Sequence, residues 1–206
     1  ARLRWHCHFI QKLEDEPKIE FENLHSAYNG LRENEFNQEY FEAWCQGKTG
    51  YPMIDACMRA LIATGWINFR MRAMLVSFAS YHLWLDWRPT SKYLAALFTD
   101  YEPGIHYSQF QMQSGTTGIN TLRIYNPIKQ GMDHDPEGEF IRKWIPELED
   151  MPTIHLHTPW ECEVALNGYP LPIIDEKVAR AYARERFSVV RRQLSHKEES
   201  KRIVKK

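Results

Sequence analysis

The sequence has few cysteines, and their spacing builds no recognisable site. The 206 residues include four cysteines, at positions 7, 45, 57 and 162, and none of them forms a CxxC pair. A disulfide framework, a zinc site or an iron–sulfur site is therefore poorly supported. Scattered thiols without a signal peptide are typical of a reducing compartment, so we expect a cytoplasmic protein, associated with the nucleoid or, in a eukaryote, nuclear.

The chain also lacks an uninterrupted apolar run and a strong net charge. Residues 66–87 are rich in apolar side chains, but Arg70, Arg72 and Asp86 interrupt them. Charged side chains are costly in lipid, so this stretch predicts a buried helix and no membrane span. The net charge of -1 argues against a strongly basic nucleic-acid module, although it says nothing about local patches.

A metal centre is not expected either. The two His-x-His pairs, His6 with His8 and His155 with His157, have no Cys or carboxylate partner at a useful spacing. We therefore assign no metal. Basic residues gather at the end of the chain, with eleven basic residues against three acidic ones in residues 177–206. We expect residues 195–206 to form a basic, mobile tail.

Most of the chain has the spacing of helices. Trp5, Phe9 and Leu13 recur every four residues and share one helical face. Further helices are expected at residues 37–46, 53–64, 66–86, 91–99 and 137–144, and from Asp175 past Arg186. No segment alternates as a strand would, so the predicted fold is an all-α, multi-helix domain over residues 1–206.

Two stretches depart from that regular pattern. Residues 101–127 are rich in Gly, Ser and Thr, which predicts an irregular segment with many side chains able to bind a ligand. The first residue is Ala1, and helical spacing starts at Arg2 without an N-cap residue before it. We therefore expect the domain to be an N-terminally truncated piece of a longer protein.

Six short sequence motifs together indicate one protein family. They are Gly47–Arg59 (GKTGYPMIDACMR), Gly65–Arg72 (GWINFRMR), Leu85–Arg88 (LDWR), Arg123–Pro127 (RIYNP), Glu137–Trp144 (EGEFIRKW) and Tyr169–Ile174 (YPLPII). In this order they resemble the C-terminal FAD-binding domain of DNA photolyases and cryptochromes. The resemblance implies a helical bundle that holds FAD in a U-shape, and a reduced flavin that, when excited by blue light, gives an electron to a pyrimidine lesion flipped out of DNA.

The resemblance implies a set of flavin-binding positions. Asp100 is expected near the flavin, paired with Arg72, although the pair could also be a purely structural buried ion pair. Tyr101 and Glu102 follow, with Glu102 placed to accept a hydrogen bond from the polar edge of the ring. His106 matches the position that faces flavin N5, where a His could donate, accept or change charge near neutral pH. His6 replaces an Arg that lies near the flavin in relatives.

An electron relay of three Trp residues is a second theme of this family. Trp44 and Trp87 match its outer and middle positions, whereas the inner position is Phe110, which is much harder to oxidise. Either the relay is broken, or an aromatic residue such as Tyr107 or Tyr101 replaces the inner Trp. Without the resemblance, both Trp residues would be interpreted as core residues.

The third theme is contact with DNA. Trp5 matches the aromatic residue that stacks on the lesion, and Arg70 and Gln130 match DNA contacts. The chain departs from the family at neighbouring positions, with Arg2 in place of a lesion-binding Glu and Phe69 in place of an Asn. Further departures are Ala73 for a Met and Met112 for a second lesion-side Trp. The lesion type and the preference for single or double strands are left open by these changes.

The predicted function is that of a light-dependent repair lyase acting on DNA with pyrimidine lesions, with FAD as cofactor. The alternative is a cryptochrome-like blue-light sensor that binds FAD and signals through a protein partner. A cofactor-free helical scaffold is a third reading for this fragment. The family's phosphate-binding loop and its antenna domain precede the Trp5 helix, so we expect the fragment to bind FAD weakly and an antenna chromophore to need that missing domain.

Overall fold

The computed structural model describes residues 2–163 and 166–205. Its helices are α1 (Arg2–Asp15), α2 (Gln38–Cys45), α3 (Pro52–Thr64), α4 (Phe69–Ser77), α5 (Trp87–Leu97), α6 (Pro103–Ser114), α7 (Pro127–His134), α8 (Glu139–Trp144), α9 (Glu176–Arg192) and α10 (Leu194–Lys205). A π-helix, η4 (Phe78–His82), continues α4. The 3-10 turns are η1 (Pro17–Glu20), η2 (Ser26–Tyr28), η3 (Glu33–Glu35), η5 (Pro146–Leu148), η6 (Thr153–His155) and η7 (Pro159–Glu161).

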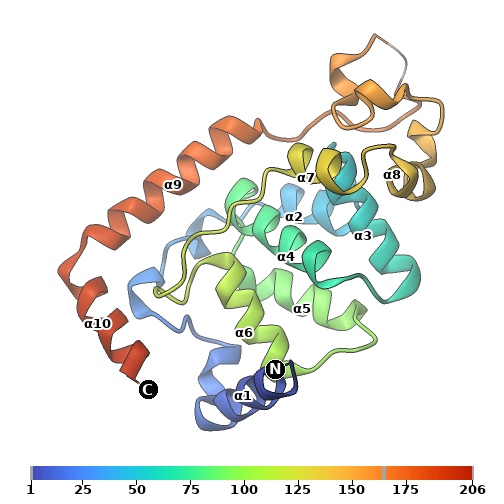
Figure 1. The fold of residues 1–206 in the computed structure, drawn as a ribbon. Coiled ribbons are helices and arrows are strands. Elements are labelled where there is room, and N and C mark those ends of the chain that lie inside the picture. Colours follow the sequence, from blue (N-terminus) through green and yellow to red (C-terminus); the bar gives the residue numbers. More distant parts are fainter. Residues whose placement is uncertain (1, 164–165, 206) are drawn as a thin grey trace.

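The all-α prediction is confirmed over the described residues, in which no strand occurs (Figure 1). None of the helices in this described part has the length and apolar character needed to span a bilayer. Local sequence explains where several helices begin. The side chains of Asn37, Asn68, Asp86, Asn126 and Asp175 each accept a hydrogen bond from a backbone N–H of the following first turn.

The main hydrophobic core lies around α3, α4 and α5, with fully buried residues such as Trp44, Leu61 and Leu75. The stretch Gly47–Arg59, which carried much of the family resemblance, has a structural role here. The buried Asp55 carboxylate accepts hydrogen bonds from the Thr49 N–H and hydroxyl, the Gly50 N–H and the Tyr169 hydroxyl. It thereby ties the start of α3 to the segment before α9.

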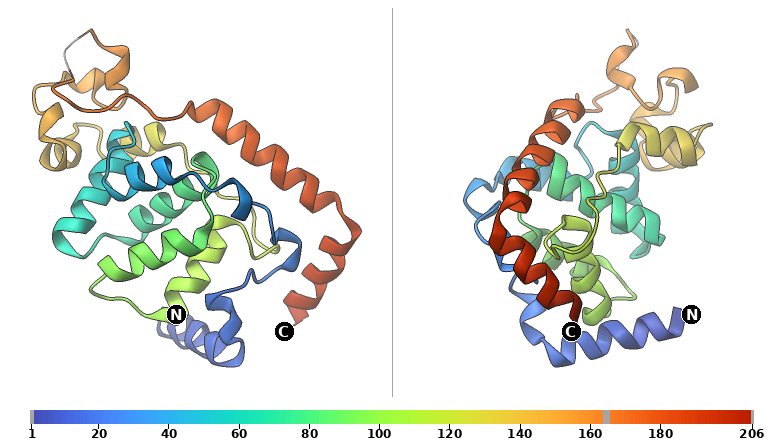
Figure 2. Two further views of the ribbon diagram at one scale, coloured as in Figure 1. Left: turned by 180° about the vertical axis from the view of Figure 1, so that it is seen from behind. Right: turned by 60° about the vertical axis from the view of Figure 1, so that its left-hand side comes forward.

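A second core fixes α9 to the rest of the molecule. Phe187 from α9 packs against Tyr28 and Tyr81, with ring centroids 5.3 and 5.5 Å away. The buried guanidinium of Arg32 lies over the Trp84 ring at 4.7 Å and over the Phe187 ring at 5.1 Å. Helix α9 therefore lies along one flank of the bundle, and α10 continues from it at an angle (Figures 1 and 2).

The end of the chain, where a basic tail is expected, forms a helix over Leu194–Lys205. The Glu199 carboxylate of α10 accepts hydrogen bonds from the Ser26 N–H and hydroxyl. The Ser200 hydroxyl lies 3.2 Å from His25 Nε2. These contacts hold one face of the basic segment against the bundle, although its excess of basic residues had predicted a segment exposed to solvent.

The prediction of an irregular segment over residues 101–127 is wrong for its first half. Residues 103–114 form α6, because Pro103 occupies the first turn and the Glu102 carboxylate caps it. The helix ends at Gly115, which has the left-handed φ of 81°. Gly104 is required for packing, since a Cβ there would lie 2.8 Å from the Phe9 carbonyl oxygen in α1.

Candidate functional site

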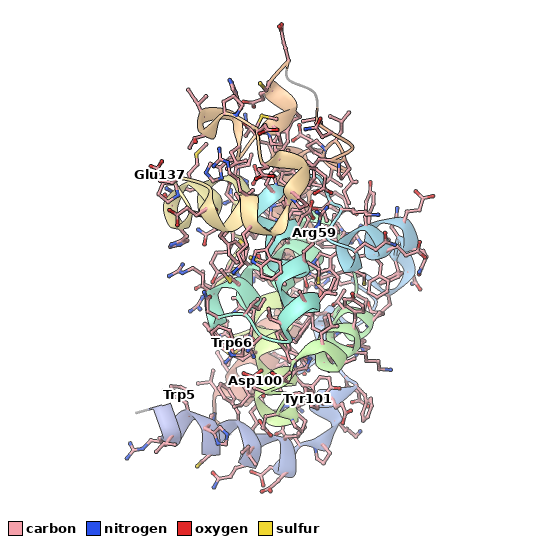
Figure 3. The ribbon with its side chains drawn as sticks, turned by 90° about the vertical axis from the view of Figure 1, so that its right-hand side faces the viewer. Trp5, Arg59, Trp66, Asp100, Tyr101 and Glu137 are labelled. Carbon is pink, nitrogen blue, oxygen red and sulfur yellow. The ribbon has the colours of Figure 1, made fainter. Side chains whose placement is uncertain are left out.

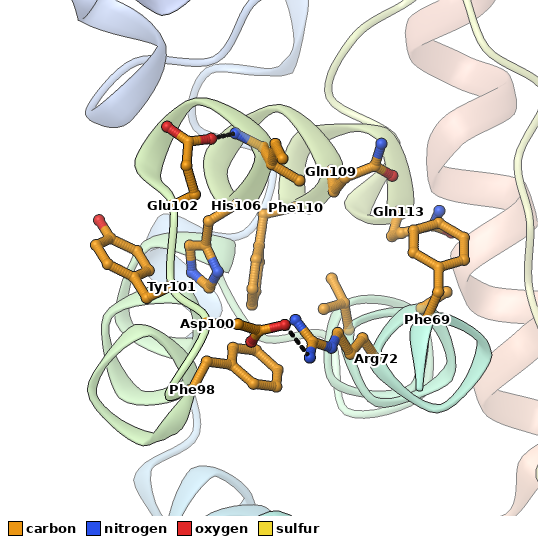
Figure 4. Close-up of a pocket in the computed structure, with 13 residues that line it drawn as sticks. Phe69, Arg72, Phe98, Asp100, Tyr101, Glu102, His106, Gln109, Phe110 and Gln113 are labelled. Atoms are coloured by element: carbon orange, nitrogen blue, oxygen red, sulfur yellow. Dashed lines mark hydrogen bonds and ion pairs between the residues drawn. The ribbon is translucent and has the colours of Figure 1, made fainter. Parts of the chain in front are cut away.

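A pocket of about 150 Å³ lies between α4, the loop before α6, and α6 itself (Figure 4). Its lining residues are Phe69, Arg72, Ala73 and Val76 from α4, Phe98, Asp100, Tyr101 and Glu102 from the loop, and Ile105, His106, Gln109, Phe110 and Gln113 from α6. The pocket thus brings together five of the six residues expected around a flavin. The sixth, His6, is exposed on α1 and does not line this pocket.

An ion pair stands at one end of the pocket. Arg72 Nη2 lies 2.9 Å from Asp100 Oδ2, and Arg72 Nε donates to the Ile67 carbonyl at 2.8 Å. The guanidinium also lies over the Phe98 ring at 4.2 Å. The Asp100 side chain is 48% exposed, so this is not a buried structural pair. Its carboxylate keeps accepting sites for a ligand while Arg72 is held rigidly in place.

His106 is a neutral hydrogen-bond acceptor in this pocket. Its Nε2 lies 2.9 Å from the Ser91 carbonyl oxygen, which can only accept, so Nε2 carries the proton and Nδ1 is left as an acceptor. Burial and, to a smaller extent, the nearby Arg72 charge lower the pKa of His106 to about 4, against the opposing effect of the hydrogen bond to the Ser91 carbonyl. A change of charge near neutral pH, one of the options left open for this residue, does not fit that pKa.

Glu102 is engaged with the backbone of α6. Its carboxylate accepts from the Gly104 N–H at 3.1 Å and from the Ile105 N–H at 2.7 Å. These bonds orient the side chain at the helix N-terminus, where a negative charge is favourable. Each carboxylate oxygen still has a lone pair free to accept from a ligand.

The residues expected to contact DNA lie in different places around this pocket. Trp5 lines a second pocket of about 240 Å³ between α1 and α6, together with Phe9 and Met112. Arg70 and Gln130 meet in a third pocket of about 420 Å³ on the other side of α4. Phe69 lines the first pocket and is 58% exposed.

Two exposed Trp residues lie toward the same end of the molecule as the first pocket. In Figure 3, Trp5 and Trp66 lie toward the same end as Asp100 and Tyr101, with Glu137 toward the other. Trp5 is 62% exposed and Trp66 is 56% exposed. The side chain of Arg2, the remaining residue expected at the lesion, lies outside the described residues.

The two predicted relay residues are both fully buried. Trp87 donates its indole N–H to Asn23 Oδ1 at 2.7 Å, and its ring centroid lies 6.5 Å from that of Tyr107. Tyr107 lies 5.2 Å from His106, so aromatic rings connect Trp87 to the pocket. Trp44 packs against Tyr93 at 6.0 Å. Phe110, at the inner relay position, lies 4.7 Å from His106.

Five lining residues were not singled out from the sequence, namely Val76, Phe98, Ile105, Gln109 and Gln113. Gln109 and Gln113 follow His106 and Phe110 at helical spacing, so they share a face of α6 with them. This spacing would have predicted both residues to line the site if residues 103–114 had been predicted to form a helix.

Comparisons with known proteins agree with this geometry. The sequence model of a family described as the FAD binding domain of DNA photolyase matches residues 1–189. A deoxyribodipyrimidine photo-lyase of Escherichia coli is 38% identical over 162 residues, covering 76% of this chain and 34% of the relative. Cryptochrome-2 of Arabidopsis thaliana is 41% identical over 151 residues, covering 68% of this chain and 25% of the relative.

Solved structures show the same likeness. An archaeal photolyase from Sulfolobus tokodaii, solved with two FAD molecules, superposes with a TM-score of 0.85 at 34% identity, covering 91% of this chain and 43% of that one. A cryptochrome from Synechocystis superposes with a TM-score of 0.78 at 28% identity, covering 89% of this chain and 40% of that one. The chain thus spans between a quarter and two fifths of the length of the curated relatives it matches.

Proposed function

The chain belongs to the photolyase/cryptochrome family as its FAD-binding domain, and on that premise we propose that it serves light-driven repair of pyrimidine lesions in DNA. The proposal rests on one observation. The pocket expected to hold the flavin and the pocket that contains Trp5 lie on neighbouring faces of α6. A lesion held by Trp5 would therefore be separated from the cofactor only by side chains of one helix.

The residues of the first pocket fit a flavin. Aromatic side chains of Phe98 and Phe110 supply flat apolar walls, and Arg72, Asp100 and His106 supply polar groups at one end. This combination of apolar lining and a few polar groups is typical of cofactor sites. At about 150 Å³ the pocket is smaller than the roughly 300–1,000 Å³ of sites that enclose a whole ligand. It therefore takes part of FAD and leaves the remainder outside.

The chain's own residues would position and tune this chemistry. Reduced FAD, when bound and excited by light, would supply an electron that splits the lesion in a carbon–carbon lyase reaction and would take the electron back once the lesion has split. Arg72 would supply a fixed positive charge to the bound ring, and Nδ1 of the neutral His106 would accept a hydrogen bond from it. The apolar walls keep water from the ring.

The second and third pockets would hold DNA. Trp5 offers an exposed ring for stacking, and base–aromatic stacking contributes roughly 1–3 kcal/mol per base. Met112 closes the same pocket with a flexible apolar side chain. Arg70 is exposed at the start of α4, and Gln130 lies beside it, so the two can contact the DNA backbone.

The test measures the loss of pyrimidine dimers from single- and double-stranded oligonucleotides under blue light, using the FAD-loaded protein and a dark control. We expect light-dependent loss on at least one substrate. Persistence of dimers on both would reject repair and favour the light-sensor function of cryptochromes. Trp5→Ala should weaken binding to damaged DNA by about 5- to 150-fold and leave flavin content unchanged. Equal loss of both would instead make Trp5 a structural residue.

A further inference from the structure

The end of the first pocket away from Tyr101 carries polar groups that the proposed chemistry does not use. Gln113 is 3% exposed, and neither its Oε1 nor that of Gln109 has a hydrogen-bond partner among the described residues. Buried acceptors in folded proteins almost always have a donor, and each exception calls for an explanation. Two such acceptors beside a ligand pocket indicate that the ligand brings the donors.

The geometry of α6 places these acceptors together. Gln109 and Gln113 are four residues apart, which is about 6 Å along a helix and on the same face. Figure 4 shows Gln113 beside Phe69, across the pocket from Tyr101. Phe69 presents a ring that is 58% exposed, so a flat group held by the glutamines could stack on it.

We propose that Gln109, Gln113 and Phe69 form a subsite for an adenine ring. The exocyclic amine of adenine has two N–H donors for the two carboxamide oxygens, and a glutamine amide also matches the N6/N7 edge of adenine in a bidentate manner. A flavin ring fits this end less well, because it has a single N–H on its polar edge. Asp100 and His106 already supply polar groups for that ring on the Tyr101 side of the pocket, and Arg72 lies between Asp100 and Phe69 (Figure 4).

The adenine could belong to FAD itself or to a base in DNA. The proposed subsite rests on the binding of FAD in this family, and it does not require repair activity. The experiment compares wild type with Gln113→Met and Gln109→Met, which keep side-chain length and remove the acceptors. Gln38→Met is the matched control, because Gln38 is exposed on α2 and bonds only to Glu42. Flavin fluorescence titrations give the Kd values for FAD, and for FMN, which lacks adenine.

If the adenine belongs to FAD, each pocket variant should bind FAD about 3- to 10-fold more weakly and FMN with unchanged affinity. If it belongs to DNA, the FAD/FMN ratio stays constant and the flavin-loaded variants lose a preference for oligo-dA over oligo-dT. Unchanged Kd values for FAD and FMN together with an unchanged preference for oligo-dA, or equal losses for FAD and FMN, would overturn the subsite. The melting temperature of the flavin-free variants should not fall, because the substitutions remove buried acceptors that have no partner. Repair activity is measured in a separate assay. A protein without repair activity would therefore still show whether the subsite binds adenine.

Discussion

His106 shows how burial defines the chemistry of one residue. Its Nε2–H is committed to the Ser91 carbonyl, and the surrounding apolar groups disfavour a charged ring. Burial in the fold lowers its pKa from 6.5 to about 4. Between these two pH values the unfolded chain binds more protons than the folded chain, so stability rises with pH in this window.

The predicted consequence is a pH-dependent stability that His106→Asn removes. The contribution of neutral His106 is complete above pH 6.5 and is lost as the pH falls toward 4, and the pKa difference corresponds to about 3 kcal/mol. Urea denaturation of the flavin-free protein at several pH values from 4 to 7.5 measures it. The difference in unfolding free energy between wild type and variant should grow with pH. Parallel curves would show that His106 titrates normally.

Asp55 lies in one of the family-like motifs and has a structural role. Its carboxylate accepts four hydrogen bonds, from Thr49, Gly50 and Tyr169. In Asp55→Asn an amide NH₂ must face at least one of these donors, so we expect a loss of about 2 kcal/mol in unfolding free energy. Asp133→Asn, at an exposed ion pair with Lys129, should change it by about 0.5 kcal/mol or less. Equal effects of the two substitutions would contradict this role.

Among the helices, several were predicted from the sequence, whereas α6 was not. The expected helices over residues 37–46, 53–64 and 137–144 are found within a few residues of the expected bounds, because their apolar spacing is regular. Helix α6 has polar and apolar residues on all sides, since α1, α4 and α5 pack around it. It therefore has no amphipathic pattern, and Gly104 suggested a loop although it allows close packing against α1.

Helix α6 also carries the residue best placed to replace the inner relay Trp. Tyr107 is 5% exposed and lies between Trp87 and Tyr101, with both ring centroids at 6.5 Å. Burial raises the pKa of Tyr107, and the neighbouring Tyr101 and Glu20 raise it further. The phenol therefore keeps its proton at neutral pH, and the Glu20 carboxylate can accept that proton when the ring loses an electron.

Tyr107→Phe should accordingly slow the light-driven reduction of bound flavin by an external donor, by about tenfold or more. The rate is followed by flavin absorbance under constant illumination. Tyr182→Phe is the control, because Tyr182 lies on α9 and bonds to Glu35. A rate that is the same in Tyr107→Phe as in wild type would mean that electrons reach the pocket without this residue.

Across the whole molecule, the packing of the helices determines which of the residues expected at the site lie together. Arg72, Asp100, Tyr101, Glu102 and His106 converge as the resemblance implied, because α4 and α6 pack directly against each other. Other features depend on distant packing. The residues expected to contact DNA are divided between separate pockets, because α1 and α7 dock on opposite sides of the central helices, and no local pattern encodes that docking.

The flank formed by α9 should be separable from the flavin pocket. Phe187 is fully buried against Tyr28, Tyr81 and Arg32, whereas it does not line the pocket. Phe187→Ala leaves a cavity in this second core, so we expect a loss of about 3–5 kcal/mol in stability. Hydrogen exchange followed by mass spectrometry should then show faster exchange in α9 and α10 than in α4 and α6.

Val189→Ala provides the comparison on the same helix, because Val189 is 56% exposed and its truncation should cost about 0.5 kcal/mol or less. The Kd for FAD should stay within about twofold of wild type in both variants, since neither residue lies at the pocket. If Phe187→Ala accelerates exchange in α4 and α6 as much as in α9, the two cores unfold as one unit. The pocket would then owe its shape to α9 as well, and truncation of that helix would release the flavin.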